Sequence, residues 1–455
     1  MGFYWIPGTL TEFGQIGAPL NHILGSLSVF VICPHLFLFS IIDKHLNLLK
    51  KAPSLDNILR SLFIATQYIT PQLFSAYPGH AWLKLAPHLF PAKYFGEYIF
   101  SFISILMALE IKHLYINKKF NRFNWGFISL FSLSCFIPNQ KINKAELFPI
   151  NVRISQANIG NNAKLSAERG LPNSVNKVLT TYKDLSTDLP YQHIDLILWP
   201  ETAFPYSLHP NILKGSLDKM PPVIQEIVNR TKADIFFGSY LRDLKNNYSK
   251  TFNSAFFARK QGINTVYNKN RLIPFGESLP FTKSINSAIY QMVPGISLFS
   301  RSNKTQMFES KTKKGNNYHF IGLICYEALA PELLRSHINT LNLMPNFMTN
   351  LTNDSWFRKT SEPEQHLFLS KWRTVEFGIP MVRVANTGIS SIIDRDGVEL
   401  IRGKTHSVDK IDGTIFAEEN PKKTVFLKFG ILPFLVLWLL FVAISFLLSR
   451  KSLSQ

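Results

Sequence analysis

The stretch FIGLICYEAL, residues 320–329, places a cysteine and an acid directly at the end of an apolar run. Residues 320–324 have the pattern of a short strand that is buried on both faces. Cys325, Tyr326 and Glu327 follow without a break. A carboxylate at the end of a buried strand needs a partner, because a lone buried charge is costly. The stretch therefore predicts a core strand that ends in a chemically active turn.

The composition of the whole chain is apolar and basic at the same time. The 455 residues are 46% hydrophobic and include 38 phenylalanines, yet the formal net charge is +19. This combination indicates a membrane protein with cationic loops. No nucleic-acid partner is expected, because the basic residues are dispersed rather than clustered with aromatic residues. Cys33 and Cys135 lie in apolar stretches, and the three cysteines have neither metal-site spacing nor an even count.

Several uncharged or weakly charged blocks are candidates for membrane spans. Leu20–Ile42 and Phe429–Ser449 carry no charge, and at ~1.5 Å per residue each is long enough to cross a hydrocarbon core of about 30 Å. Three weaker candidates lie between them: Ser61–Leu83, Phe95–Ile111 and Trp125–Pro138. We therefore expect about four spans before the polar middle of the chain and one span after it.

The charge of the connecting loops predicts an orientation. Lys and Arg are concentrated in DKHLNLLKK (43–51), in KHLYINKKFNR (112–122) and in the C-terminal tail RKSLSQ. The positive-inside rule places these loops in the cytoplasm and residues 140–423 on the opposite side. From the N-terminus, we therefore predict membrane helices at 1–139, an extracytoplasmic domain at 140–423, and a C-terminal membrane helix with a cytoplasmic tail at 424–455.

Residues 140–423 alternate short apolar runs with amphipathic stretches. Helices are expected at 212–231 and 362–377, the second starting after Ser361 as N-cap with Pro363 just inside. The expected strands are NVRISQANI, IDLILWP, DIFFGSY, TFNSAFFAR, INTVYNK, HFIGLICY, NFMTNL, MVRVAN and ISSIID. Strands and helices that alternate in one block predict an α/β layered domain.

Charged residues stand at three of the predicted strand ends. Glu201 follows a buried strand in LILWPETAFP, and Lys269 and Glu277 lie in YNKNRLIPFGESLP. Cys325 and Glu327 are the third case. Each alone has an ordinary structural explanation: a helix cap, a solvated hairpin residue or an inert core thiol. Three such ends in one domain indicate a site, because α/β folds build sites at the carboxyl ends of strands.

The three strand ends together supply the functional groups that an acyl-transfer reaction needs. A free thiol has a pKa of about 8.5, so only a small fraction is thiolate at neutral pH. A carboxylate nearby can remove the thiol proton, and an ammonium can stabilise the negative charge that develops on a tetrahedral intermediate. Cysteine, glutamate and lysine therefore suffice as nucleophile, base and electrostatic stabiliser.

The order Glu–Lys–Cys and the motifs WPET, KNRLIPFGE and CYE resemble the nitrilase, or carbon–nitrogen hydrolase, superfamily. With LTNDSWF, EQHLFLSKWRTVEFGIPMVRVANTGISSIID and the flanking spans, the chain is similar to the apolipoprotein N-acyltransferase family of bacterial inner-membrane enzymes. The resemblance implies an α/β fold: a nitrilase-like αββα sandwich, attached to a transmembrane helix bundle and facing the periplasm. That family has further spans before the point at which this chain begins, so we expect the N-terminal part of the bundle to be truncated.

The resemblance also implies roles for individual residues. Glu201 is expected to be the general base, Lys269 the stabilising ammonium and Cys325 the nucleophile. The remaining matched residues are expected to support these three or to contact the acyl chain. The supporting residues are Glu277, Glu327, Asn253 and Tyr326, and the substrate-binding residues are Trp356 and Phe357.

The implied reaction moves a fatty acyl chain from a phospholipid to Cys325 as a thioester. The N-terminal amine of the diacylglyceryl-cysteine of an apolipoprotein then accepts the chain. Membrane lipids and the apolipoprotein are the expected partners of a monomeric enzyme, and no cofactor or metal is expected. Two alternatives stay open: a membrane-tethered nitrilase-type amidase, and a degenerate paralogue that binds lipid or lipoprotein without catalysis.

Overall fold

The computed structural model describes most of the chain and divides it into two units. The sandwich unit consists of Met1–His22, Ile142–Thr374 and Ile379–Lys422, and the helical unit consists of Ile23–Lys141, Val375–Gly378 and Lys423–Gln455. The described residues are 3–12, 16–46, 63, 65–68, 70, 72, 77–118, 120–139, 146–214, 219–245, 248–274, 276–279, 285–286, 298–357 and 359–453.

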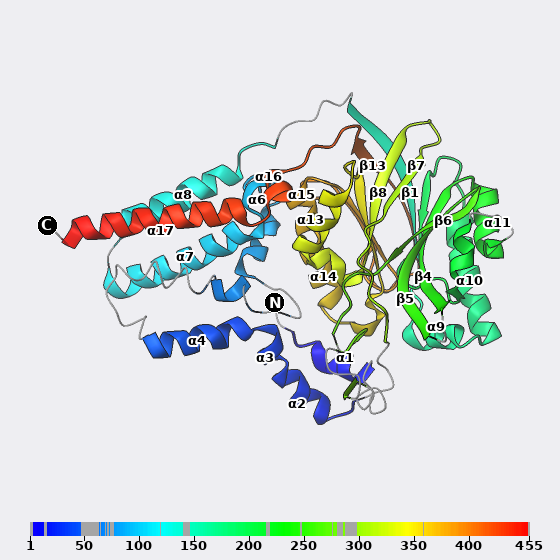
Figure 1. Cartoon of the computed structure of the whole chain (residues 1–455), viewed down its shortest axis with the longest axis horizontal. Coiled ribbons are helices and arrows are strands. Elements are labelled where there is room, and N and C mark those ends of the chain that lie inside the picture. Colours follow the sequence, from blue (N-terminus) through cyan, green and yellow to red (C-terminus); the bar gives the residue numbers. More distant parts are fainter. Residues whose placement is uncertain are drawn as a thin grey trace. The chain divides into compact units, whose positions relative to one another are not determined.

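Two β-sheets lie side by side in the sandwich unit (Figure 1). The first, seven-stranded sheet has the order β13-β1-β2-β4-β5-β6, with β3 beside β4, and the second, six-stranded sheet has the order β12-β11-β10-β9-β8-β7. Strands β1, β2 and β4 are parallel, as are β8, β9 and β10. The strand bounds are β1 Leu147–Gln156, β2 Leu196–Leu198, β3 Ser207–Leu208, β4 Asp234–Lys245, β5 Tyr248–Arg259, β6 Gly262–Asn268, β7 Met307–Lys311, β8 Asn317–Ile324, β9 Phe347–Thr352, β10 Met381–Ala385, β11 Ser391–Ile393, β12 Glu399–Arg402 and β13 Asp409–Glu418.

Aromatic side chains from both sheets form the core between them. The ring of Phe236 on β4 lies 4.8 Å from Phe308 and 5.2 Å from Phe320, centroid to centroid. Gly322 on β8 leaves the room for this packing, because a Cβ there would lie 2.7 Å from the Phe236 ring. Residues 320–324 are all buried, so the strand predicted from the opening stretch is confirmed.

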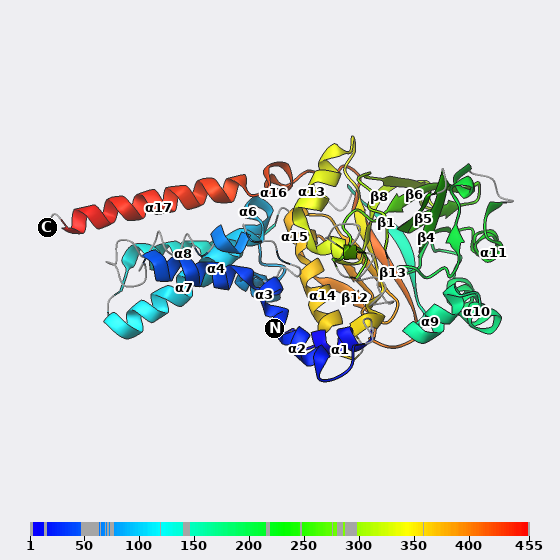
Figure 2. The same cartoon turned by 60° about the horizontal axis from the view of Figure 1, so that its bottom comes forward.

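Helices cover the outer faces of the two sheets (Figures 1 and 2). On the first sheet, Tyr182 of α10 stacks on Trp199 at 4.8 Å in a cluster that also includes buried residues of α11. On the second sheet, Leu334 of α13 and Leu367 of α14 are buried. The bounds of these helices are α9 Asn161–Glu168, α10 Pro172–Thr187, α11 Pro222–Thr231, α13 Pro331–Thr340, α14 Glu362–Ser370 and α15 Trp372–Phe377. The predicted α/β class is confirmed.

All the strands predicted between residues 151 and 394 are present, but both predicted helices are shorter. Helix α11 starts only at Pro222, because the pair Pro221–Pro222 disfavours helical backbone before it. The second predicted helix is divided into α14 and α15 at Lys371. Ser361 does occupy the N-cap position of α14, but its hydroxyl accepts from the Gln365 side chain at 3.1 Å rather than from a backbone N–H.

The first residues of the chain belong to the sandwich unit, which differs from the predicted division at residue 140. Trp5 is 3% exposed and lies edge-on to Phe357 at 5.1 Å. Its indole N–H donates to Gln365 Oε1 at 3.2 Å. These contacts attach α1, Ile6–Glu12, to the rest of the sandwich unit.

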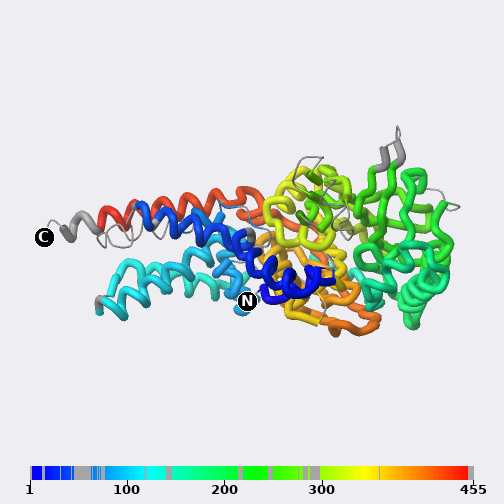
Figure 3. Tube along the Cα trace, turned by 90° about the horizontal axis from the view of Figure 1, so that it is seen from below, coloured from blue at the N-terminus to red at the C-terminus, as the bar shows by residue number. Residues whose placement is uncertain are grey.

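The helical unit contains long apolar helices that run along one direction (Figure 3). Phe441 of α17 contacts Phe102 of α7 at 5.1 Å and Phe127 of α8 at 4.9 Å, so these three helices pack together. The bounds of the helices are α2 Leu20–Leu27, α3 Val29–Ile32, α4 Pro34–Leu46, η3 Pro78–Leu85, α6 Ala92–Phe95, α7 Glu97–Asn117, α8 Arg122–Cys135, α16 Val425–Phe429 and α17 Leu432–Leu453.

Among the described residues, one helix is long and apolar enough to cross a membrane. It is the Glu97–Ile116 part of α7, with a mean hydropathy of 1.6. The apolar part of α17, Leu432–Leu448, is shorter. The predicted continuous span Leu20–Ile42 is instead divided into α2, α3 and α4, and α4 begins at Pro34, which has no N–H to continue the helix from α3. Part of the predicted span 61–83, and residues 47–51 of the basic loop 43–51, lie outside the described residues.

Candidate active site

Cys325 begins a tight turn where β8 ends. The cysteine turn, Cys325–Leu329, is a short 3₁₀ helix. Cys325 itself has φ +55°, a left-handed conformation that residues other than glycine rarely adopt, and is 6% exposed. Such a strained backbone persists only where surrounding contacts hold it. Strained residues of this kind are typical of functional positions.

Glu327 fastens the cysteine turn to the loop that carries Lys269. Its Oε1 accepts from the backbone N–H groups of Asn270 at 2.6 Å and Arg271 at 3.0 Å. Its Oε2 accepts from Ile324 N at 2.8 Å, and the Tyr267 hydroxyl donates to both oxygens at 2.9 Å. The prediction that Glu327 has a partner is therefore confirmed. It bonds to the backbone beside Lys269 rather than to the ammonium.

Lys269 lies between two carboxylates and is 1% exposed. Its Nζ donates to Glu277 Oε1 at 2.7 Å and to Glu201 Oε1 at 3.4 Å. Asn253 on β5 donates from Nδ2 to the same two oxygens, at 3.2 Å for Glu277 and 2.7 Å for Glu201. The structure thus brings together four predicted site residues that come from three separate segments of the sequence.

Burial and charge set the protonation of the nucleophile and the ammonium. Burial raises the pKa of the Cys325 thiol well above its ordinary value; the Glu201 carboxylate raises it further, and Lys269 opposes them. Burial acts to lower the pKa of Lys269, but the carboxylates of Glu277 and Glu201 outweigh it and raise that pKa. The resting site therefore holds a neutral thiol beside a charged lysine, and a base is needed to form the thiolate.

Glu201 is held at the end of β2 by contacts to both sheets. Its Oε2 accepts from the backbone N–H of Asn353, which follows β9 of the second sheet, at 3.0 Å. Its Oε1 faces Asn253 and Lys269 from the first sheet. The carboxylate is therefore fixed in one orientation, as a positioned general base requires.

Comparison with known proteins places the chain in a family. Residues 151–417, which contain Cys325, Glu201 and Lys269, match the carbon–nitrogen hydrolase family. The chain belongs to that family.

Several relatives of the chain share one name. The chain is 27% identical to the apolipoprotein N-acyltransferase of Bdellovibrio bacteriovorus over 98% of this chain and 82% of the relative. The enzyme of the same name from Haemophilus ducreyi is 25% identical over 99% and 86%, and that from Rickettsia bellii 30% identical over 67% and 57%. Among solved structures, an amidase from Nesterenkonia sp. AN1 matches with a TM-score of 0.40 and 14% identity, covering 66% of this chain and 99% of that chain. The relatives confirm the resemblance that the motifs indicated.

One glycine of the chain makes room for Glu201, the residue predicted to be the base. A Cβ at Gly238 on β4 would lie 2.5 Å from Pro200 O and Thr202 N, and 2.7 Å from Glu201 Cα. Gly238→Ala should therefore displace Glu201 and lower the acylation rate by about 10²-fold, since misplacement of a catalytic group by ~1 Å has that size of effect. The measurement is single-turnover acylation of the purified chain.

The matched control for that substitution is Gly160→Ala. A Cβ at Gly160 meets nothing within 4 Å, and its φ of −70° suits any residue. Its acylation rate should stay within about two-fold of the wild type, as expected for a substitution away from packed positions. Equal losses in the two variants would mean that the close approach at Gly238 does not position the base.

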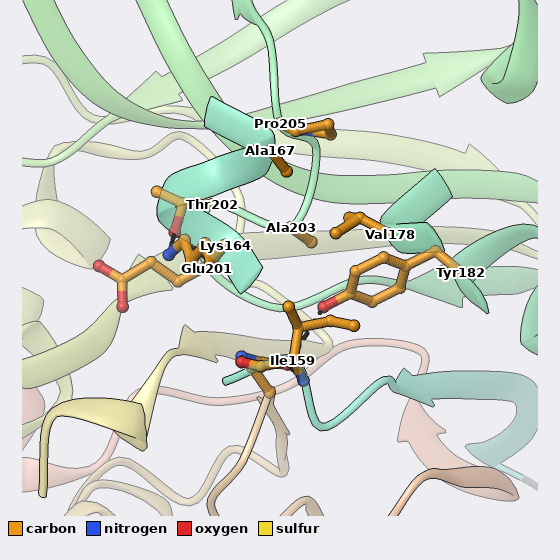
Figure 4. A pocket seen from close by; sticks show the side chains of 10 residues that line it. Ile159, Lys164, Ala167, Val178, Tyr182, Glu201, Thr202, Ala203 and Pro205 are labelled. Atoms are coloured by element: carbon orange, nitrogen blue, oxygen red, sulfur yellow. Dashed lines mark hydrogen bonds between the residues drawn. The ribbon is translucent and has the colours of Figure 1, made fainter. Parts of the chain in front are cut away.

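A pocket lies behind Glu201 (Figure 4). Lys164 of α9 donates to the Thr202 hydroxyl there, and in the figure the Glu201 carboxylate points away from Tyr182 and Val178. The lining residues are Ile159, Lys164, Ala167, Val178, Tyr182, Glu201, Thr202, Ala203, Pro205 and Asn386. Because this lining does not include the nucleophile, we do not assign the pocket to the acyl chain.

The two predicted substrate-contacting aromatics differ in environment. Trp356 is partly exposed, whereas Phe357 is buried, with its ring 5.1 Å from Trp5 and 6.2 Å from Tyr326. Tyr326, predicted to support the site, donates its hydroxyl to Glu362 Oε1 and stacks on His366 at 4.3 Å. The structure thus joins Phe357 to the cysteine turn through Tyr326. Contact of either aromatic with an acyl chain stays a prediction.

Sequence reasoning missed a buried cluster beside the cysteine turn. Asp354, Glu362 and His366 have ligand atoms within 4.8 Å of one another, which is close enough for a metal ion. The guanidinium of Arg383 already donates to Asp354 Oδ2 at 2.9 Å and neutralises it, so we assign the cluster to hydrogen bonding. The signal in the sequence was an arginine in the middle of the apolar strand MVRVAN, where a charge requires a buried partner.

Proposed function

We propose that the chain is the acyltransferase that its relatives' name describes. It would move a fatty acyl chain from a phospholipid, through a Cys325 thioester, to the N-terminal amine of a diacylglyceryl apolipoprotein. The observation that carries the proposal is the group formed by the buried Lys269, Glu201 and Asn253 and the partly buried Glu277, beside a nucleophile in a left-handed turn. Near-full-length similarity to apolipoprotein N-acyltransferases supports transfer over simple amide hydrolysis.

In the first half-reaction, Cys325 Sγ attacks the carbonyl carbon of a phospholipid ester. A C–S bond forms and the C–O bond to glycerol breaks. Glu201 takes the thiol proton and returns it to the departing glycerol oxygen. Lys269 stabilises the negative charge that develops on the carbonyl oxygen. The raised pKa of the Cys325 thiol explains why proton removal must accompany attack.

In the second half-reaction, the α-amine of the acceptor attacks the thioester carbon. A C–N bond forms and the C–S bond breaks. The proton lost by the amine passes through Glu201 to the Cys325 sulfur, so the enzyme returns to its starting state. The products are a lysophospholipid and an N-acylated lipoprotein, and neither step consumes a cofactor.

The proposed location is the inner membrane of a bacterium, with the sandwich unit facing the periplasm. Both substrates carry acyl chains whose removal from a bilayer costs about 0.8 kcal/mol per CH₂, so the enzyme must work at the membrane surface. The apolar helix α7 and the apolar part of α17 support anchoring by several spans. The basic segment 112–122, which runs from the last turns of α7 to the first residue of α8, supports a cytoplasmic loop on the other side.

A labelled phospholipid tests the reaction. The purified full chain, mixed with a phospholipid that carries a labelled acyl chain, should acquire label that hydroxylamine removes, because thioesters are cleaved by hydroxylamine. Addition of a diacylglyceryl peptide should then move the label to the peptide amine, as a ping-pong reaction requires.

The alternatives give different results in the same assay. Release of labelled fatty acid without labelled peptide would overturn the transferase and favour the amidase-type hydrolase. Absence of label on a folded wild-type chain would favour the degenerate paralogue that binds lipid without catalysis.

A further inference from the structure

The backbone of Cys325 is held on both sides by buried side chains. On one side, Glu327 accepts from Ile324 N at 2.8 Å. On the other side, Asn350 Nδ2 donates to the carbonyl oxygen of Cys325 at 2.9 Å. Because Cys325 has φ +55°, these contacts hold a conformation that a cysteine would not keep by itself.

Asn350 is in turn oriented by a buried arginine. The two residues are paired in register on adjacent parallel strands, Asn350 on β9 and Arg383 on β10. Arg383 Nη1 donates to Asn350 Oδ1 at 2.7 Å. This bond identifies the Asn350 oxygen as the acceptor, so its NH₂ group must face the Cys325 carbonyl.

Arg383 is fixed by Asp354, which follows β9. Arg383 Nη2 donates to Asp354 Oδ2 at 2.9 Å, and both side chains are fully buried. Thr352 donates to the other oxygen of Asp354 at 2.9 Å. The close approach of Asp354 needs a glycine opposite it, because a Cβ at Gly388 would lie 2.0 Å from Oδ2.

We propose that Arg383 is a positioning residue for the nucleophile: held by Asp354, it orients Asn350, and Asn350 fixes the carbonyl of Cys325 in its left-handed turn. The hydrogen-bonded path crosses from β10 through β9 to the end of β8. It aligns Sγ with Glu201 and Lys269 without touching substrate. This role rests on the proposed function, because it assumes that Cys325 is the acylated residue.

The substitution that separates positioning from simple packing is Asn350→Asp. An aspartate of nearly the same size still accepts from Arg383, but it has no N–H to donate to the Cys325 carbonyl. We expect the rate of acyl-enzyme formation to fall by about 10- to 100-fold, because misalignment of a reacting atom has that size of effect. The KM for phospholipid should change little, since no substrate contact is removed.

A second variant and a matched control complete the experiment. Arg383→Lys keeps a positive charge near Asp354 but cannot bridge Asp354 and Asn350 with one ammonium, so it should show the same rate loss. Arg153→Lys removes another fully buried guanidinium, which donates to Asp412 Oδ2 at 2.7 Å in the first sheet. It should lower the melting temperature while leaving acylation within about three-fold of wild type, as expected for a purely structural pair.

Each outcome decides the proposal. Wild-type acylation rates in folded Asn350→Asp, or an equal loss in Arg153→Lys, would overturn the positioning role. If Asn350→Asp and Arg383→Lys both lack a cooperative melting transition while Arg153→Lys retains one, the path holds the fold together and the proposal is also overturned. Failure of the wild-type chain to acquire label would instead overturn the proposed function, and it is measured in the same assay.

Discussion

Replacement of Cys325 by alanine should abolish acyl transfer and leave the protein folded. Loss of a nucleophile typically lowers turnover by roughly 10⁴–10⁶-fold. The alanine side chain fits the space of the thiol, since Cys325 is 6% exposed within the core between the sheets. The measurement is retention of label on the chain after incubation with labelled phospholipid, followed by hydroxylamine treatment.

Cys325→Ser distinguishes chemistry from packing in the same experiment. Serine has nearly the size of cysteine, but its hydroxyl is far less acidic than a thiol, and Glu201 is a weak base for it. We expect little label on the serine variant. Cys135→Ser is the control, because Cys135 is a buried cysteine of the helical unit and should not affect labelling. Label that persists in Cys325→Ala would show that another residue carries the acyl group.

Lys269→Arg should fail nearly as completely as Lys269→Ala. Lys269 is 1% exposed, its ammonium lies 2.7 Å from Glu277 and 3.4 Å from Glu201, and a planar guanidinium would place the charge differently. Loss of one group that stabilises an oxyanion lowers the rate by about 10²–10³-fold. Lys269→Ala should in addition lower the free energy of unfolding by about 3–5 kcal/mol, because it leaves buried carboxylates unpaired.

Lys371→Arg provides the control for the change from ammonium to guanidinium. Lys371 also pairs with a carboxylate, Glu399, at 2.8 Å, and lies largely buried in the same unit. Its acylation rate should match the wild type. Single-turnover acylation and urea unfolding of the three variants test both effects. Near-normal acylation by Lys269→Arg would show that the lysine only neutralises its carboxylates.

The sequence by itself predicted where the candidate catalytic residues lie. The apolar run of residues 320–324 predicted a strand buried on both faces, and the run is fully buried. Glu201, Lys269 and Cys325 were predicted at strand ends: Lys269 and Cys325 directly follow β6 and β8, and Glu201 comes shortly after the end of β2. The pattern of a few consecutive residues suffices for such predictions, because it shows both whether a strand is buried on its two faces and where the strand ends. The site then combines the ends of β2 and β6 from the first sheet with the end of β8 from the second.

Other features depended on residues that are distant in the chain. Arg383 is recognisable in the sequence as a charge inside an apolar strand. The neighbouring residues do not show that its guanidinium donates to Asn350 and to Asp354. Likewise, Trp5 packs on Phe357 across most of the chain length. Such partners are set by strand register and side-chain direction, which are decided only when the sheets assemble.

The electrostatic state of the nucleophile was also decided by the tertiary structure. A cysteine next to a lysine and two glutamates could hold a thiolate or a neutral thiol, according to how much water reaches it. The pKa of Cys325 is raised because the fold buries its sulfur, and because the carboxylate of Glu201, which Asn253 and the Asn353 N–H hold in place, adds to the rise. The desolvation of the Cys325 sulfur depends on the whole fold, so it cannot be predicted from a short stretch of sequence.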